Sequence, residues 1–264
     1  MTSTDFDHRF GGIRRLYGDA ALQQLRHCHV AVIGVGGVGS WVAEALARTA
    51  VGQITLFDMD DICVSNVNRQ IHALNGSIGK LKVEAMAERL CAINPELVCH
   101  PEMAFVTEKN LEAMLDRGFD YVVEATDSVK AKAAIINWCV RHKVSVITSG
   151  GAGGQIDPTL IQVADLTKTL QDPLASKVRA KLRKDYGFTR DPKRKFGVEC
   201  VFSTEQLRYP QPDGQVCAQK PAGDGPVKLD CASGFGASTC VTATFGLFAA
   251  SRVINKLSLR TKSS

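Results

Sequence analysis

The feature that most constrains the fold is a glycine-rich turn between an apolar segment and an amphipathic one. Residues 29–33 (HVAVI) predict a buried strand, residues 34–39 (GVGGVG) a tight turn, and residues 40–49 a helix. Glycines permit such a turn and let backbone N–H groups approach a phosphate at the positive end of the helix. The pattern therefore predicts a nucleotide-binding unit, with the alternative that the glycines only pack the helix onto the strand. The glycines expected to line the nucleotide are Gly34, Gly36, Gly37 and Gly39.

Strand-like and helix-like segments alternate as far as residue 148. Short apolar segments predict further strands at 53–57, 98–105, 121–123 and 144–148. Amphipathic segments predict helices at about 80–93, 108–116 and 128–142. The alternation predicts an α/β chain with a Rossmann-like, doubly wound and mostly parallel sheet, followed by a C-terminal extension.

Charged residues follow the predicted strands. Asp58 stands at the end of the second strand, 19 residues after Gly39, where a carboxylate can accept hydrogen bonds from ribose hydroxyls. Arg69 and Lys82 can neutralise phosphate oxygens, and Asp127 can hold Mg²⁺. A nicotinamide dehydrogenase would also contain the glycines and Asp58, and any one of these charges alone is explained by exposure to solvent. A dinucleotide has no use for Arg69, Lys82 and Asp127 together, so we expect a nucleoside triphosphate.

Five motifs occur in a fixed order between about residues 30 and 130. After the glycine-rich turn come Asp58-Met-Asp60, Ser65-Asn-Val-Asn-Arg-Gln70, Gly79-Lys-Leu-Lys-Val83 and Thr126-Asp-Ser128. Their pattern is similar to that of the ubiquitin-activating-enzyme-like adenylating superfamily (HesA/MoeB/ThiF), which includes activators of molybdopterin synthase and of the thiamin sulfur carrier. The resemblance implies that the chain uses ATP and Mg²⁺ to convert a carboxylate into an acyl-adenylate.

The resemblance also implies roles for individual residues. It places the ribose at Asp58, and Mg²⁺ and the reacting centre beside Asp127. An N-terminal arginine reaches into the partner subunit's site in this superfamily, which implies a homodimer; we take it to be Arg15 rather than Arg9 or Arg14. The cofactor-binding set is Gly34, Gly36, Gly37, Gly39, Asp58, Asp60, Asn66, Arg69, Gln70 and Lys82. The catalytic set is Asp127, which is also the metal ligand, with Arg69, Lys82 and Arg15.

The C-terminal half resembles one branch of this superfamily, the tRNA threonylcarbamoyladenosine dehydratases. The similar segments are 150–158, 172–174, 200–205 and 231–236, and the resemblance extends from Arg9 to about residue 255. It implies ATP-dependent dehydration, by cyclisation, of the modified adenosine beside the anticodon. The expected partners are tRNA carrying threonylcarbamoyladenosine, a second copy of the chain, and a sulfur-transfer protein of a cysteine desulfurase system.

Charge and composition suggest three parts of the chain. We expect an N-terminal arm at 1–27, an ATP-binding Rossmann-like core at 28–165, and an extension at 166–264 that ends in a helix over about 238–257. The extension contains a basic segment, 177–195, in which nine Lys or Arg and two Asp give a charge of +7, against +5 for the whole chain. Such a segment suits an RNA backbone, although a solvated helix and tail would show the same charge.

The nine cysteines contain no C-x-x-C pair, so we expect no zinc. Cys231 is interpreted as a small buried residue, the alternative being a persulfide or acyl acceptor. The polar N-terminus and the scattered thiols indicate a cytoplasmic protein. Residues 231–251 are free of charge but rich in Gly, Ala, Ser and Thr, which favours a buried helix over association with a membrane.

Two other functions are compatible with these motifs. An activator of the C-terminus of a ubiquitin-like sulfur-carrier protein would use the same ATP site with a protein as its substrate. A nucleotide-sensing module would bind ATP without catalysis and would not need Asp127 or Lys82. The basic segment 177–195 favours the tRNA substrate.

Overall fold

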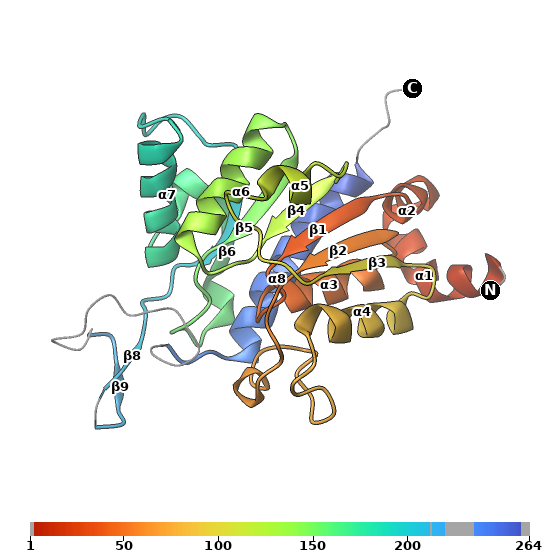
Figure 1. Ribbon diagram of the computed structural model, residues 1–264, viewed down its shortest axis with the longest axis horizontal. Coiled ribbons are helices and arrows are strands. Elements are labelled where there is room, and N and C mark those ends of the chain that lie inside the picture. Colours follow the sequence, from red (N-terminus) through yellow and green to blue (C-terminus); the bar gives the residue numbers. More distant parts are fainter. Residues whose placement is uncertain (1–2, 212, 220–234, 260–264) are drawn as a thin grey trace.

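Strands and helices alternate along the computed structural model, which describes residues 3–211, 213–219 and 235–259 (Figure 1). The main sheet contains β1 (His29–Ile33), β2 (Gln53–Phe57), β3 (Val98–Glu102), β4 (Tyr121–Glu124), β5 (Ser145–Ser149), β6 (Ile161–Asp165) and β7 (Glu199–Ser203). A small hairpin pairs β8 (Tyr209–Pro210) with β9 (Val216–Cys217). The helices are α1 (Ser3–Tyr17), α2 (Asp19–Arg26), α3 (Gly39–Arg48), α4 (Lys82–Ile93), α5 (Leu111–Leu115), α6 (Val129–Arg141), α7 (Pro173–Asp185) and α8 (Thr239–Ser258). Three 3-10 helices lie at Val64–Asn66 (η1), Pro158–Leu160 (η2) and Leu166–Lys168 (η3).

The strand order in the main sheet is β3-β2-β1-β4-β5-β7-β6. Every neighbouring pair is parallel except β6 and β7, so the prediction of a mostly parallel α/β sheet is confirmed. The carboxyl ends of the six parallel strands therefore meet at one edge of the sheet. Ligands of open parallel sheets bind outside this edge, near the point where the strand order reverses, which here lies between β1 and β4.

Helices cover both faces of the sheet, and the apolar side chains of each strand alternate between the two layers. In β1, Val30 and Val32 pack in the layer that contains α3, α4 and α8, whereas Ala31 and Ile33 pack in the layer that contains α5, α6 and α7. All four side chains are almost completely buried. A strand buried on both faces reads as a continuous apolar run, which is why residues 29–33 were recognisable in the sequence.

The C-terminal helix α8 packs beside the helix that follows the glycine-rich turn. Gly246 allows this contact, since a Cβ atom there would lie 2.7 Å from the Val38 carbonyl oxygen and 2.7 Å from the Trp41 Cβ atom. The start of α8 is tied to the motif after β2, because the Thr239 hydroxyl donates to the Asn68 carbonyl oxygen at 2.5 Å. The extension is thus part of the structure around the glycine turn.

Two features of the chain were not visible in its local sequence pattern. The N-terminal 27 residues, expected as an arm, contain the packed helices α1 and α2, whose Phe6, Phe10 and Leu22 form a small buried cluster with Ala50. At the other end of the sheet, β7 inserts between β5 and β6 although no strand was predicted there.

The glycine turn itself depends on the absence of side chains at two positions. Gly34 has a φ of 87°, and a Cβ atom on it would lie 2.9 Å from the Ala125 carbonyl oxygen. A Cβ atom on Gly39 would lie 1.8 Å from the Gly34 carbonyl oxygen, a backbone atom that cannot turn away. Any side chain at residue 39 must therefore push α3 away from the turn.

We expect Gly39→Ala to lower the free energy of unfolding by about 1–3 kcal/mol, because the added methyl group overpacks the turn. Gly36→Ala is the matched control, since its Cβ atom would meet only the Gln70 amide nitrogen, at 4.0 Å. Urea unfolding without nucleotide measures both variants. If the two variants were equally stable, the close contact between residue 39 and the Gly34 carbonyl oxygen would be contradicted.

Candidate functional site

The glycine turn is anchored to the end of β2 by a buried carboxylate. One oxygen of Asp58 accepts a hydrogen bond from the Val35 N–H at 2.7 Å, and the other accepts one from the Asp60 N–H at 3.0 Å. Asp58 is only 7% exposed. It therefore holds the turn between β1 and α3 and keeps further lone pairs for a ligand at the carboxyl edge of the sheet.

A buried lysine lies beside this carboxylate. Lys82, the first residue of α4, contacts Asp60 at 2.7 Å and Asp58 at 3.9 Å. A cation at the start of a helix is disfavoured by the helix dipole, so the two carboxylates compensate for its position. The Asp60 side chain is 56% exposed, whereas that of Lys82 is 9% exposed.

The motif at 65–70 lies across the glycine turn. The side chain of Arg69 passes close to Gly37, where a Cβ atom would lie 3.2 Å from its Cγ atom. The Arg69 carbonyl oxygen accepts a hydrogen bond from the Trp41 indole at 3.0 Å, which joins this motif to α3. Gln70 is 5% exposed, and its Oε1 atom has no hydrogen-bonding partner in the described part of the chain. Asn66 caps η1 by accepting from the Cys63 N–H at 3.1 Å.

His72 is a buried histidine near Lys82. Its ring is 3% exposed, and neither nitrogen contacts a partner among the described residues. Burial, together with the charges of Lys82 and Arg89, lowers the pKa of His72 to about 4. The ring is therefore neutral near pH 7 and adds no charge to those of Lys82 and Arg89.

Asp127 lies in the turn after β4 and is exposed. The turn touches the glycine loop, because a Cβ atom on Gly34 would be 3.1 Å from the Thr126 backbone nitrogen. No hydrogen bond ties the Asp127 carboxylate to another described residue. The structure thus brings Asp127 to the same edge as the glycine turn, with its carboxylate available to a ligand.

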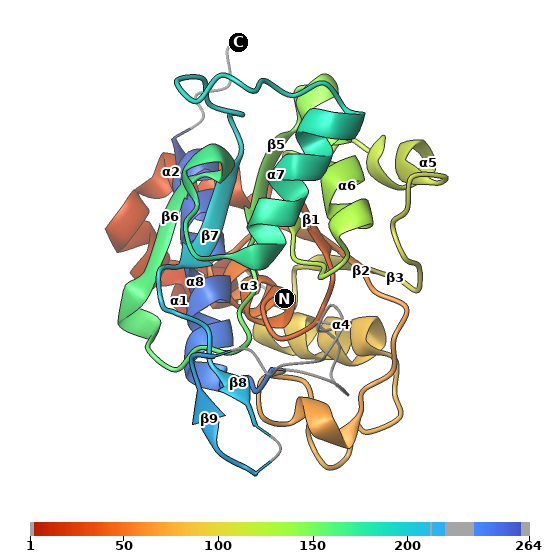
Figure 2. The ribbon, with the colours of Figure 1, turned by 90° about the vertical axis from the view of Figure 1, so that its left-hand side faces the viewer.

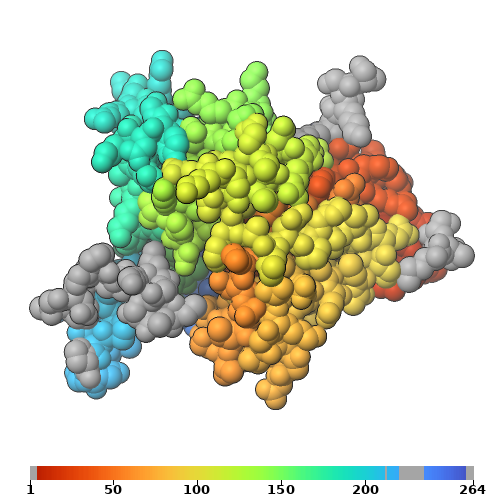
Figure 3. Space-filling view, viewed as in Figure 1, coloured from red at the N-terminus to blue at the C-terminus, as the bar shows by residue number. Residues whose placement is uncertain are grey.

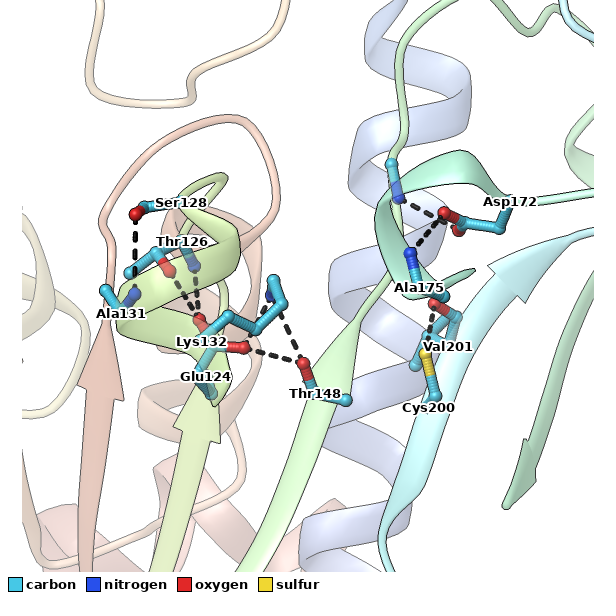
Figure 4. Close-up of polar contacts among 11 residues, drawn as sticks. Glu124, Thr126, Ser128, Ala131, Lys132, Thr148, Asp172, Ala175, Cys200 and Val201 are labelled. Atoms are coloured by element: carbon cyan, nitrogen blue, oxygen red, sulfur yellow. Dashed lines mark hydrogen bonds and ion pairs between the residues drawn. The ribbon is translucent and has the colours of Figure 1, made fainter. Parts of the chain in front are cut away.

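A buried polar network holds the turn that presents Asp127 (Figure 4). One Glu124 oxygen accepts from the Thr126 N–H at 2.9 Å and from the Thr126 hydroxyl at 2.6 Å. The other oxygen accepts from the Thr148 hydroxyl at 2.6 Å and pairs with the Lys132 ammonium. Glu124, Lys132 and Thr148 are at most 1% exposed, so this ion pair is shielded from solvent.

A second buried carboxylate, Asp172, lies at the start of α7 (Figure 4). Its carboxylate caps α7 by accepting from the Ala175 N–H at 2.9 Å, and it accepts from the Gly151 N–H at 3.0 Å. Burial raises the pKa of Asp172, an effect that these hydrogen bonds and the charge of Lys132 oppose. Glu124 and Lys132 were missed in the sequence, where the available signal was a charge placed inside an otherwise apolar strand or helix.

The N-terminal arginines lie away from this edge of their own chain. Arg9 donates to the carbonyl oxygen of Ile93 at 3.5 Å, and Ile93 ends α4 far from Lys82, which begins it. Arg14 is paired with Asp7 and Asp19, whereas Arg15 is exposed. Figure 3 shows the N-terminal helices (red) and α7 with the loop after it (teal) at well-separated parts of one face.

The basic segment starts near the site and ends far from it. Helix α7 begins beside Gly151 and extends about 20 Å at 1.5 Å per residue. Figure 2 shows it running away from the end where β8 and β9 lie. Arg190, Lys193, Arg194 and Lys195 are exposed beyond its far end.

Three expectations concern metal, membrane and Cys231. No group of three or more His, Cys, Asp or Glu side chains within residues 3–211, 213–219 and 235–259 could hold a metal ion. No helix in the same ranges is long and apolar enough to cross a membrane. Cys231 lies outside the described residues.

Comparison with known proteins gives matches along nearly the whole chain. The model of the ThiF family matches residues 12–263. The tRNA threonylcarbamoyladenosine dehydratase of Escherichia coli (strain K12) is 57% identical over 257 residues, which are 97% of this chain and 96% of that protein. A solved structure named TcdA (CsdL) has a TM-score of 0.89 at 53% identity, covering 97% of this chain and 96% of that one. The E. coli dehydratase solved in complex with ATP has a TM-score of 0.85 at 50% identity, covering 97% of this chain and 96% of that one.

We expect Lys132→Met to destabilise the protein by about 3–5 kcal/mol, because it leaves the Glu124 carboxylate buried without its cation. Lys130→Met is the matched control: this lysine lies on the same helix, is 71% exposed and pairs with Glu108 at 3.0 Å. Its loss should change stability by less than about 1 kcal/mol.

Thermal and urea unfolding measure both single variants. The double variant Glu124→Gln, Lys132→Met removes both charges and should recover part of the loss. A Lys132→Met protein as stable as the Lys130→Met protein would refute the role of the buried pair.

Proposed function

The chain belongs to the ThiF family, and we propose that it is an ATP-dependent tRNA threonylcarbamoyladenosine dehydratase. The observation that carries this proposal is the extent of the likeness to proteins of that name, which includes the extension as well as the nucleotide core. An activator of a sulfur-carrier protein would require only the core motifs. The extension with its basic helix α7 supports the tRNA substrate instead.

The reaction divides into two substitutions. A carboxylate oxygen of the threonyl group attacks the α-phosphorus of ATP, which forms an acyl-adenylate and releases pyrophosphate. A nucleophilic atom of the same modification then attacks the activated carbonyl carbon, loses its proton, and expels AMP. The oxygen that leaves with AMP is the one lost from the carboxylate, so the nucleoside loses one water overall.

The residues around the glycine turn suit the ATP phosphates. The turn offers backbone N–H groups at the start of α3, and Arg69 and Lys82 provide positive charge beside it. Asn66 and Gln70 add amide groups from the motif that crosses the turn. We assign the ribose to Asp58, with Asp60 as the carboxylate that holds Lys82 until the phosphates arrive.

Asp127 suits a magnesium ion that arrives with the nucleotide. Mg²⁺ in phosphate-transfer sites is held by one or two carboxylates, with phosphate oxygens and waters completing its shell. Asp127 can provide one such carboxylate, because it is exposed and lies in a turn that the Glu124 network holds at the edge of the sheet. The metal would neutralise phosphate charge, while the chain itself keeps Asp127 in position.

Ring closure needs no nucleophilic cysteine. An internal nucleophile already has an effective concentration of roughly 10⁵ M or more when it is held close to the carbonyl carbon. Burial raises the pKa of Cys139 to about 12 and also raises that of Cys200, so neither thiol supplies a thiolate near pH 7. The chain's task is to orient the modification and exclude water.

We infer that the active form is a homodimer. Arg15 is exposed on α1, far from the nucleotide edge of its own chain, so it can complete only the site of a second copy. Helix α8 also exposes Leu247 and Phe248, apolar surface that a partner can cover. The basic segment of α7 is assigned to the tRNA backbone, and a sulfur-transfer partner stays a prediction.

Asp127→Asn should lower turnover of threonylcarbamoyl-tRNA by about 10²-fold or more, because the variant loses the charge that faces the metal and phosphates. The assay incubates enzyme, ATP and tRNA and measures the loss of one water from the nucleoside by mass spectrometry. Asp116→Asn, an exposed aspartate after α5, is the control and should retain full activity. Near-normal turnover by the Asp127 variant would sink the assignment.

Mixing inactive Arg15→Ala and Asp127→Ala proteins should restore part of the activity. In a mixed dimer, one site receives Arg15 from one copy and Asp127 from the other, and is complete. Subunit exchange is verified with differently tagged copies, and activity is followed by pyrophosphate release. A mixture that stays inactive after exchange would exclude the shared site.

A further inference from the structure

A cavity of about 450 Å³ lies beside the nucleotide site, between the start of α7 and the segment that leads into β8. Its lining includes Thr169, Asp172 and Arg179 from one side, and Gln206 and Tyr209 from the other. The volume is in the range of small-molecule sites. None of the residues assigned to ATP lines it.

The cavity and the nucleotide site share the carboxyl edge of the sheet. Asp172, at the cavity wall, is bonded to Gly151, which follows β5, and Asp127 follows β4, the neighbour of β5. The cavity lies on the β7 side of β5, so it is roughly two strand spacings, or about 10 Å, from the turn of Asp127. A group attached to a base in the cavity can therefore point toward Asp127.

The lining combines a ring, a cation and an amide. Tyr209 is half-buried, and its ring is held by the ring of Phe235, with centroids 5.1 Å apart. The Gln206 side chain is exposed, so its amide can bond the edge of a base. The only carboxylate in the lining, Asp172, is 4% exposed and already accepts from the Gly151 and Ala175 N–H groups.

The cation has no carboxylate partner. Arg179 donates from one nitrogen to the hydroxyl and the carbonyl oxygen of Thr169, and no carboxylate in the described chain forms an ion pair with it. Burial and the neighbouring Arg183 lower the pKa of Arg179, an effect that the charge of Asp172 opposes. An anion at the cavity mouth would pair with this guanidinium group.

We propose that this cavity receives the tRNA nucleotide to be modified, with its base stacked on Tyr209 and its phosphodiester near Arg179. The inference rests on the proposed function, and it adds where the substrate nucleoside is held. A nucleotide beside the anticodon must leave the stack of its loop before its threonylcarbamoyl carboxylate can reach ATP. The cavity holds the unstacked base while the carboxylate extends along the edge of the sheet toward Asp127.

The test compares Tyr209→Ala with Tyr209→Phe, which keeps the ring. The substrate is an anticodon stem-loop RNA that carries threonylcarbamoyladenosine. Loss of one aromatic stacking contact should raise the KM for this RNA by about 5- to 150-fold in the alanine variant and leave the affinity for ATP unchanged. The phenylalanine variant should keep the KM of the wild-type protein within about twofold, because stacking needs only the ring.

A second measurement follows RNA binding directly and does not depend on turnover. In a stem-loop with 2-aminopurine at the modified position, stacking on residue 209 should change the fluorescence in the wild-type and phenylalanine proteins but not in the alanine protein. Arg179→Met should make the negative slope of log affinity against log salt shallower by about 0.7, the value for one contact to single-stranded phosphate.

An alanine variant with wild-type KM and the wild-type fluorescence change would overturn the proposal. If the wild-type protein bound the 2-aminopurine RNA through Tyr209 but did not dehydrate the modified RNA, the proposed reaction would fail while the nucleotide site stood. If it dehydrated the RNA equally well without the ring of residue 209, the reaction would stand and the cavity would not be its nucleoside site.

Discussion

The buried pair of Lys132 and Glu124 is the interaction on which the arrangement of the site depends. A carboxylate at the end of β4 would be costly to bury alone, and the ammonium from α6 and the Thr148 hydroxyl compensate for it. Its other oxygen fixes Thr126, so the turn that carries Asp127 has one geometry. A change in either buried partner should therefore alter the position of Asp127, although neither partner contacts it.

The extension and the core form one structure around the glycine turn. Gly246 brings α8 against α3, and Thr239 and Asn68 join the start of α8 to the motif that crosses the turn. The last helix of the chain therefore packs directly on the glycine turn and on the motif at 65–70.

Two groups of cations lie at one edge of the sheet. Arg69 and Lys82 flank the glycine turn on the β1–β2 side, whereas Arg179 and the basic helix α7 lie on the β7 side. Asp127 lies between them, after β4. The two groups of cations therefore form separate charged surfaces on either side of Asp127.

The sequence by itself predicted the strands and helices between residues 29 and 149, because the periodicity of apolar residues is a local property of the chain. It also placed Asp58, Arg69, Lys82 and Asp127 near the glycine turn, because the ends of parallel strands meet at one edge of a sheet. It did not reveal the packed helices α1 and α2 or the insertion of β7. Nor did it reveal the partners of Glu124, Lys132 and Asp172, which come from different elements. Only the tertiary structure decided these features, since the partners of a buried charge and the place of a strand in the sheet depend on residues distant in the chain.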